Sequence, residues 1–234
     1  MKLKKNTRGK WSFGGRIPKE FDTHIKKSVP FYYEGHQIIL GLSDYFLSKK
    51  SLCYDLGCSS SSLLIQLSKF TNKENIQFIG LEIDKDMYNF AKKSLKISNV
   101  KNIKLYNKDI SKYNLLKSNL IISYYTMQFI HPSSRQKIYD KIYKSLNWGG
   151  AFIIFEKIRG NDARFDNILN SLYWDFKEKN QFTSNEIIQK SQSLRGVLEP
   201  FSDKGNLGYL KRSGFSDIQT VFQYLCFKGY LCIK

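Results

Sequence analysis

The chain has 234 residues, of which 41% are hydrophobic and 15% aromatic, so it can bury the core of one large domain or two small ones. Its formal net charge is +18, but the lysines that carry it are spread along the whole chain. Because an AT-rich genome produces the same composition, the charge does not by itself predict a nucleic-acid partner, and it does not exclude one. No apolar run reaches the roughly 18 residues of a membrane span, and no secretion signal is visible, so we expect no membrane association and a cytoplasmic location.

The first part of the chain predicts a lid and a helix. Residues 1–20 are basic and place Trp11 and Phe13 beside two glycines, which is typical of a loop. Apolar residues then recur at helical spacing over 33–48. We expect one domain over 1–234, in which residues 1–48 supply this N-terminal lid and its helices.

Strands and helices alternate from position 52 onward. Strands are predicted over 52–56, 77–82, 103–106, 120–124 and 151–156, and helices over 60–70, 85–97 and 133–146. The segment Asn147, Trp148, Gly149 and Gly150 is predicted to end the last helix with a glycine stop. Since single helices separate the strands, we expect parallel pairing through right-handed crossovers.

The last third of the chain has a different pattern. Residues 160–200 lack a strand pattern and predict an inserted helical segment above the carboxyl ends of the strands, where it would shape a substrate pocket. Residues 215–222 and 224–233 are two strand-like runs almost back to back, which predicts an antiparallel hairpin. A parallel sheet that ends in such a hairpin is typical of the class I methyltransferase fold, a Rossmann-like α/β architecture with a mostly parallel seven-stranded sheet.

Three features indicate a nucleoside cofactor at the carboxyl edge of the sheet. Gly57 follows the first strand and opens a helix, and the backbone amides of Cys58 and Ser59 are expected to face the cofactor. Glu82 ends the second strand, 27 positions after Asp55, where a carboxylate can bind the two hydroxyls of a ribose. Asp109 follows the third strand and can accept from an adenine amino group, while Ile110 covers the ring. Together these features predict S-adenosylmethionine.

The substrate side is less defined. Tyr124, Tyr125 and Gln128 follow the fourth strand, where aromatic faces can stabilise a sulfonium, although ordinary core packing explains them equally well. Basic residues in or beside the inserted segment could neutralise an acidic substrate or simply form a solvated helix face; they are Arg159, Arg164, Lys190 and Arg195. No general base can be named, and methyl transfer needs one only if the acceptor carries a proton.

Cysteine and histidine give no support for a metal. The four cysteines, Cys53, Cys58, Cys226 and Cys232, lack the paired spacing of a zinc site, and the three histidines are scattered. We expect reduced thiols in or near the core.

Over nearly its whole length the chain resembles the bacterial carboxy-S-adenosylmethionine synthases, a branch of the class I methyltransferases. The resemblance is carried by residues 11–13, 21, 28–32, 54–59, 126–129, 141–143, 146–151, 156–157, 175–177, 186–187, 189–190, 214–215 and 222–223. It implies S-adenosylmethionine and prephenate as substrates, a carboxylated sulfonium as the product for later tRNA wobble modification, and a homodimer.

The resemblance also implies site residues. It implies cofactor contacts by Tyr32, Gly57, Cys58, Ser59, Glu82, Asp109 and Ile110, to which we add Ile83 and Tyr124 as candidates. Candidate substrate-pocket residues are Trp11, Tyr125, Gln128, Trp174, Lys190, Ser191 and Arg195. Tyr124 stands where the family has asparagine, and Ser191 stands where it has the arginine that grips the extra carboxylate. A serine cannot replace a bidentate guanidinium, although Arg195 lies one helical turn further on.

Three functions stay open at this point. The missing arginine favours an S-adenosylmethionine-dependent methyltransferase that acts on a small, polar or anionic metabolite. The synthase activity itself is the alternative, with another cation in place of the arginine. The third is a non-catalytic subunit that binds S-adenosylmethionine and RNA.

Overall fold

The computed structural model describes residues 17–71 and 73–234 and contains a seven-stranded sheet. The strands run in the order β3-β2-β1-β4-β5-β7-β6. Their bounds are β1 Leu52–Leu56, β2 Gln77–Glu82, β3 Ile103–Asn107, β4 Ser118–Tyr124, β5 Leu146–Lys157, β6 Asp217–Tyr224 and β7 Phe227–Ile233. The first five strands pair in parallel, while β7 is antiparallel to both β5 and β6. The predicted parallel sheet and its terminal hairpin are therefore confirmed.

Helices cover both faces of this sheet. One apolar cluster joins the sheet to α2 (Tyr32–Phe46) and α3 (Ser62–Phe70), next to which α4 (Lys85–Ser98) packs. A second cluster on the opposite face joins it to α5 (Pro132–Ser145) and α8 (Asp203–Ser213). The central strands are apolar on both faces because both are covered, which is the usual state of a parallel sheet.

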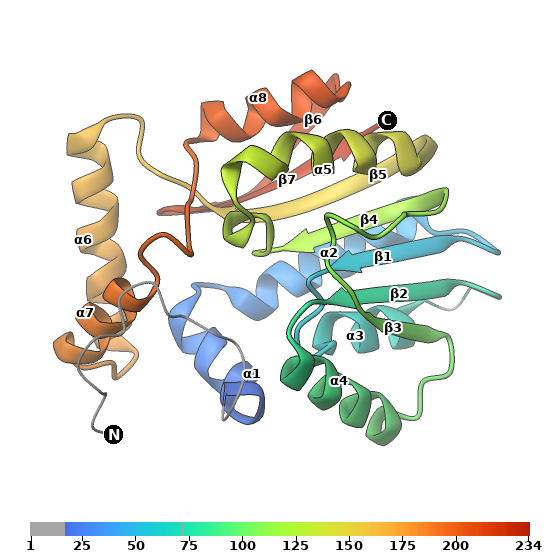
Figure 1. Ribbon diagram of the computed structural model, residues 1–234, viewed down its shortest axis with the longest axis horizontal. Helices are drawn as coiled ribbons and strands as arrows, with labels where there is room; N and C mark the ends of the chain where they lie inside the picture. The colour runs from blue at the N-terminus through green and yellow to red at the C-terminus, as the bar shows by residue number, and fades with distance from the viewer. Residues whose placement is uncertain (1–16, 72) are drawn as a thin grey trace.

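The remaining helices lie beyond the carboxyl ends of the parallel strands. Figure 1 shows α6 (Ala163–Lys179) and α7 (Ser184–Ser193) beyond the end toward which β1 and β4 run, with α1 (Ile17–Ser28) near them. The carboxyl ends of parallel strands are where α/β folds bind their ligands. Both helices of the inserted segment are thus near the edge where the sequence predicts the site.

One predicted boundary is wrong. Asn147, Trp148, Gly149 and Gly150 do not end a helix; α5 already ends at Ser145, and these residues form the beginning of β5. Gly149 has φ +74° and donates its amide hydrogen to the Lys234 carbonyl. The glycine therefore serves an irregular strand beginning, where a turn signal and a strand signal look alike in the sequence.

The cysteines and the apolar character of the helices were also subjects of prediction. All four cysteines are free and buried, as predicted. Among the described residues, no helix combines the length and apolar character that a membrane crossing requires.

Candidate functional site

The glycine loop between β1 and α3 is tightly built. Gly57 has φ +81°, a conformation that favours glycine, and a Cβ there would overlap the side chain of Thr126. The amides of Gly57 and Cys58 both donate to the Leu81 carbonyl, at 2.8 and 3.0 Å. The loop is therefore fixed against the end of β2 before any ligand arrives.

This arrangement corrects the expectation for the two loop amides. The Cys58 amide is bonded to Leu81, and the Ser59 amide donates to Glu82 Oε2 at 3.0 Å, so neither is left to face a cofactor. The physical reason is that buried backbone amides take the nearest acceptor, and β2 supplies one for each. A ligand at this loop would meet backbone and side chains that the protein has already ordered.

Glu82 is the link between the loop and the second strand. Its side chain is buried, and its two oxygens accept from the amides of Ser59 and Asp84 at 3.0 and 2.9 Å. Burial raises the pKa of Glu82, and the two amide hydrogen bonds partly oppose that rise. Since each carboxylate oxygen has two lone pairs, both can still accept from ligand hydroxyls.

Asp55 is a functional candidate for which the sequence indicates no role of its own. It is 2% exposed at the end of β1, and burial together with nearby Glu82 raises its pKa to about 7. Its charge also raises the pKa of Tyr32, after burial and Asp22, which places the two side chains near one another. Two buried carboxylates in one place suit a cationic ligand, because a positive charge relieves their repulsion.

A lysine of α5 holds the loop after β3 by hydrogen bonds to its backbone carbonyls. Asp109 Oδ1 accepts from the amide and hydroxyl of Ser111, at 2.8 and 2.7 Å. Lys141, on α5, donates to the carbonyls of Ile110, Ser111 and Tyr113 at 2.9, 2.8 and 3.0 Å. Lys141 therefore fixes the backbone beside Asp109, a role that no local sequence signal indicates.

Two apolar side chains accompany these acids. Ile83 follows β2 and is 67% exposed, while Ile110 follows β3 and is buried. Glu82 and Asn107 are paired in register, so the two isoleucines follow neighbouring strand ends. A flat ring between these strand ends would cover the exposed apolar surface.

An aromatic cluster closes the end of β4. The Tyr124 hydroxyl donates to the Tyr32 carbonyl at 2.6 Å, and the Tyr124 ring lies 5.1 Å from that of Tyr32 and 4.9 Å from that of His36. Gly35 makes this possible, because a Cβ there would overlap the Tyr124 hydroxyl. Tyr124 therefore packs toward α2 as a core residue.

Two more of the predicted pocket residues lie next to this cluster. Tyr125 is buried with φ 57°, and its amide donates to the Phe155 carbonyl. The side-chain oxygen of Gln128 accepts from the Lys157 amide at 2.7 Å, so the Gln128 side chain is engaged with the end of β5. Both residues therefore fix the loop that follows β4.

The amides of this loop contact a buried acid, Glu156, that sequence reasoning missed. Glu156 is 1% exposed on β5, and burial raises its pKa to about 8, against the opposing effects of Arg135 and the amides of Met127 and Gln128. Arg135 is itself buried and donates to the carbonyls of Ile130, Gln128 and Glu199. The pair positions the loop after β4 and the chain that leads to α8.

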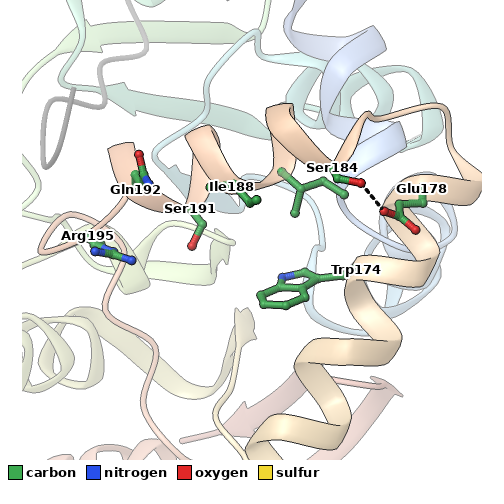
Figure 2. Close-up of a pocket in the computed structure, with 8 residues that line it drawn as sticks. Trp174, Glu178, Ser184, Ile188, Ser191, Gln192 and Arg195 are labelled. Atoms are coloured by element: carbon green, nitrogen blue, oxygen red, sulfur yellow. Dashed lines mark hydrogen bonds between the residues drawn. The ribbon is translucent and has the colours of Figure 1, made fainter. Parts of the chain in front are cut away.

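Three of the other predicted pocket residues share one groove, and Lys190 does not. Trp174, Ser191 and Arg195 line a single groove between α6 and α7, together with Glu178, Ser184, Ile187, Ile188 and Gln192 (Figure 2). Ser184 donates to Glu178 at one end of this groove. None of the predicted cofactor residues lines it.

Lys190 points away from this groove, to α1, where its ammonium lies 2.7 Å from His24 Nε2 and 3.0 Å from Ser28 Oγ. Trp11 lies outside the described residues.

Comparison with known families and sequences agrees over nearly the full chain. Residues 47–212 match the family model described as a methyltransferase domain. A protein of Staphylococcus epidermidis is 37% identical over 96% of this chain and 97% of its own length. Others of Sulfurimonas denitrificans and Campylobacter lari are 35% and 32% identical, over 96% and 99% of this chain and 94% and 98% of theirs. All three are carboxy-S-adenosyl-L-methionine synthases by name.

Solved structures agree on the fold. A putative S-adenosylmethionine-dependent methyltransferase of Methanococcus maripaludis matches 100% of this chain and 96% of its own with a TM-score of 0.62 at 19% identity. Human N-acetylserotonin methyltransferase, in complex with S-adenosylmethionine, matches 86% of this chain and 51% of its own with a TM-score of 0.59 at 15% identity. At these identities the likeness shows the fold, which is the predicted class I methyltransferase fold.

Proposed function

Because the chain belongs to the carboxy-S-adenosyl-L-methionine synthase family of the class I methyltransferases, we propose that it carboxylates S-adenosylmethionine. It is an S-adenosylmethionine-dependent transferase, with that compound as its cosubstrate. The family resemblance implies prephenate as the donor of the carboxyl group. In the proposed reaction, prephenate loses this group as CO2 together with its ring hydroxyl as hydroxide, which leaves phenylpyruvate. The S-methyl group loses one hydrogen as a proton, which the hydroxide takes up as water, and the methyl carbon forms its new bond to the CO2.

One observation carries this proposal: the three relatives described above share one name and match nearly the whole chain, the first at 37% identity over 96% of it. The match therefore includes the inserted helices α6 and α7 as well as the cofactor end. Class I methyltransferases of different chemistry share the sheet, so a likeness confined to the sheet would support no particular reaction.

The residues at the cofactor end supply what binding requires. Glu82 and Asp109 have acceptor capacity for ribose hydroxyls and an adenine amine, and Asp55 adds a buried negative charge for the cationic part of the ligand. The Gly57 loop allows the close approach, and the aromatic rings of Tyr32 and Tyr125 favour a sulfonium. Alignment in such a site supplies much of the rate, because both reactants are held at contact distance.

A second candidate, methyl transfer to a small anionic metabolite, is favoured by Ser191. This serine lines the α6–α7 groove at the position of the family's carboxylate-binding arginine, and the guanidinium of Arg195 lies on the same groove. A hydroxyl offers one donor without charge, whereas the extra carboxylate of the synthase product calls for a cation.

Mass spectrometry of the reaction separates these candidates. The enzyme is incubated with S-adenosylmethionine and prephenate, and the nucleoside products are weighed. We expect a product that keeps the sulfonium and gains a carboxylate. Release of S-adenosylhomocysteine with an anionic acceptor, and no carboxylated product, would establish the second candidate; binding without turnover by either route would support the non-catalytic subunit.

A gain-of-function variant sharpens this test. Replacing Ser191 by arginine restores the family's cation, so S191R should retain the carboxylated product more tightly than the wild type does. S184R places the same added charge elsewhere on this groove and serves as the control. Equal retention by both variants would mean that position 191 has no particular role in holding the carboxylate.

Three wider expectations join the proposal. We propose one domain in which residues 1–48 and 160–200 enclose the substrate, a homodimer, and a cytoplasmic location. Half-exposed apolar side chains along α6 support the dimer; they are Phe165, Ile168 and Leu172. Light scattering measures the mass, and cell fractionation the location. RNA binding would appear as a strongly salt-dependent affinity.

A further inference from the structure

Two lysines from separate elements lie over one tyrosine ring near the carboxyl end of the sheet, and a third lysine lies near them. The ammonium of Lys177, on α6, lies 4.2 Å from the centre of the Tyr173 ring, and that of Lys157, at the end of β5, lies 4.8 Å from it. Lys190, on α7, is near enough for the charge of Lys177 to act on it. The chain thus gathers three positive charges where α6, α7 and β5 meet.

Lys177 has no counter-charge within the described part of the chain. Its side chain is 8% exposed. Across residues 17–71 and 73–234, its ammonium has neither a hydrogen-bond acceptor nor a carboxylate, and the ion pairs there involve other lysines. A buried ammonium whose partners are aromatic rings and not anions is costly, and a bound anion would compensate its charge.

The acids of the neighbouring helices are engaged elsewhere. Asp166 accepts from the Gly160 amide, Glu178 from Ser184, and Glu186 from Thr183 in a capping box. Asp175, also on α6, is exposed and forms no ion pair within residues 17–71 and 73–234. Besides the Tyr173 ring, Lys157 contacts the neutral side chain of Asn170, at 3.4 Å. The positive charges of Lys177 and Lys157 are therefore not balanced by the acids of the neighbouring helices.

The pKa values of these groups agree with this geometry. Burial and the charge of Lys157 lower the pKa of Lys177 to about 8, and burial and Lys177 lower that of Lys190 to about 7. Burial and the charges of Lys190 and Lys177 lower the pKa of His24 to about 4, so this ring is neutral and adds no further charge near neutral pH. An anion between these ammoniums would relieve their repulsion.

The cluster is connected to the cofactor end through two contacts. Tyr173 and Tyr125 both pack on Phe227, at 5.1 and 5.8 Å between ring centres, so one ring separates the cluster from the end of β4. Helix α1 lies against both ends: Ser28 accepts from Lys190 and Tyr173, and Asp22 accepts from Ser60 of the glycine loop. A molecule held by the lysines would lie beside the cofactor.

We propose that Lys177 and Lys190, supported by Lys157, form a binding site for the carboxylate of a small organic anion that reacts with the cofactor. Its role as the reacting substrate rests on the proposed function, while the binding site itself does not. The carboxylate of the cofactor's own methionine is the competing source. We favour the substrate because Lys157 ends β5, two strands from β1 and its glycine loop, which is about 10 Å across a sheet.

The test compares two ligands across four proteins. Calorimetry measures the Kd of S-adenosylmethionine and of prephenate for the wild type, K177M, K177R and K179M; malonate serves as a second dicarboxylate at constant ionic strength. Lys179 is an exposed lysine on the same helix and is the matched control. We expect at least one dicarboxylate to bind about tenfold to a hundredfold more weakly to K177M, and nearly normally to K177R and K179M. S-adenosylmethionine should bind all four alike.

Three results would overturn the site. They are a dicarboxylate affinity that K177M leaves unchanged, no dicarboxylate binding by the wild type, and a loss in K177M of S-adenosylmethionine affinity alone. Should prephenate bind through Lys177 without yielding a carboxylated product, the site stands and the synthase function fails. Should K177M and the wild type form the carboxylated product equally, the synthase function stands and the site fails.

Discussion

The two ends of the site carry opposite charges and are built in different ways. At β1 and β2, Asp55 and Glu82 are buried acids, and Glu82 is bonded to backbone amides only a few residues from the strand ends. Where β5, α6 and α7 meet, the charged groups are the buried Lys177 and the half-buried Lys157 and Lys190, and their contacts reach far along the chain, as from Lys190 to His24. The acidic end is thus assembled locally, and the basic end only when the inserted helices pack on α1.

On the assignment that we propose, this difference would let one site hold a cation and an anion in contact. Opposite charges in one pocket would neutralise one another, whereas here the acids belong to the first strands and the lysines to the last parallel strand and the insertion. Each end is left with a charge that its own ligand compensates. Variants that affect one end and spare the other therefore test whether the two ends bind their ligands independently.

The largest effect is expected at the acidic end. E82A removes the carboxylate proposed to bind the ribose, together with the acceptor of the half-buried Ser59 and Asp84 amides, and should weaken S-adenosylmethionine binding about a hundredfold. Calorimetry measures this Kd beside that of prephenate, which should change little. E74A, at an exposed acid paired with Lys49, is the control. Equal losses for both ligands would show that the two ends are not independent.

Protein stability should respond in the opposite sense at the basic end. K177M removes a buried ammonium and should raise the free energy of unfolding at pH 7 by about 1–3 kcal/mol, measured by urea denaturation. The folded-state pKa of Lys177 is about 8, below its ordinary 10.5, so the unfolded chain binds more protons between these values. Wild-type stability should therefore gain a contribution as pH rises from 8 to 10.5, and K177M should lack it. A destabilised K177M would mean that Lys177 has a structural partner.

The pH dependence of binding should differ in sign between the two ends. Asp55, with a pKa of about 7, gains its negative charge as pH rises, so S-adenosylmethionine binding should strengthen from pH 6 to 8. Lys190 and Lys177, with pKa values of about 7 and 8, lose charge over a similar range, so dicarboxylate binding should weaken. Each change is about tenfold or less. Parallel slopes in calorimetric titrations would contradict the assignment of charges.

The smallest effect concerns a residue that touches neither ligand. K141A removes the donor to three carbonyls beside Asp109 and should weaken S-adenosylmethionine binding about threefold to tenfold by loosening that loop. K144A, at an exposed position on the same helix, should have no effect. Hydrogen exchange of the loop amides distinguishes loosening from loss of the fold, and an unchanged Kd would reduce Lys141 to a surface contact.

The acidic end could largely be predicted from the sequence, because its signals are local. The predicted strands 52–56 and 77–82 match β1 and β2 at both ends, and Gly57, Glu82 and Asp109 follow directly from strand ends. What failed there was the state of the Cys58 and Ser59 amides, since their acceptors come from another strand. Hydrogen-bond partners across a sheet are decided by register, which a single strand does not reveal.

The basic end could not be predicted in the same way. Of the seven predicted pocket residues, Trp174, Ser191 and Arg195 lie on one groove, whereas Lys190 turns from that groove toward α1, and the sequence assigned Lys177 no role. The contacts that decide this join residues far apart, such as Tyr173 and Ser28. Helical spacing indicates which side chains share a face, but not which neighbour that face meets.

The contact between Gly35 and Tyr124 has a consequence for the history of this lineage. Tyr124 occupies the space that a methyl group at position 35 would need, and its hydroxyl bonds the turn where α2 begins. A descendant can enlarge residue 35 only after residue 124 has become smaller, and in the reverse order the intermediate is overpacked. Substitutions at the two positions are therefore expected to occur in one order, with residue 124 changing first.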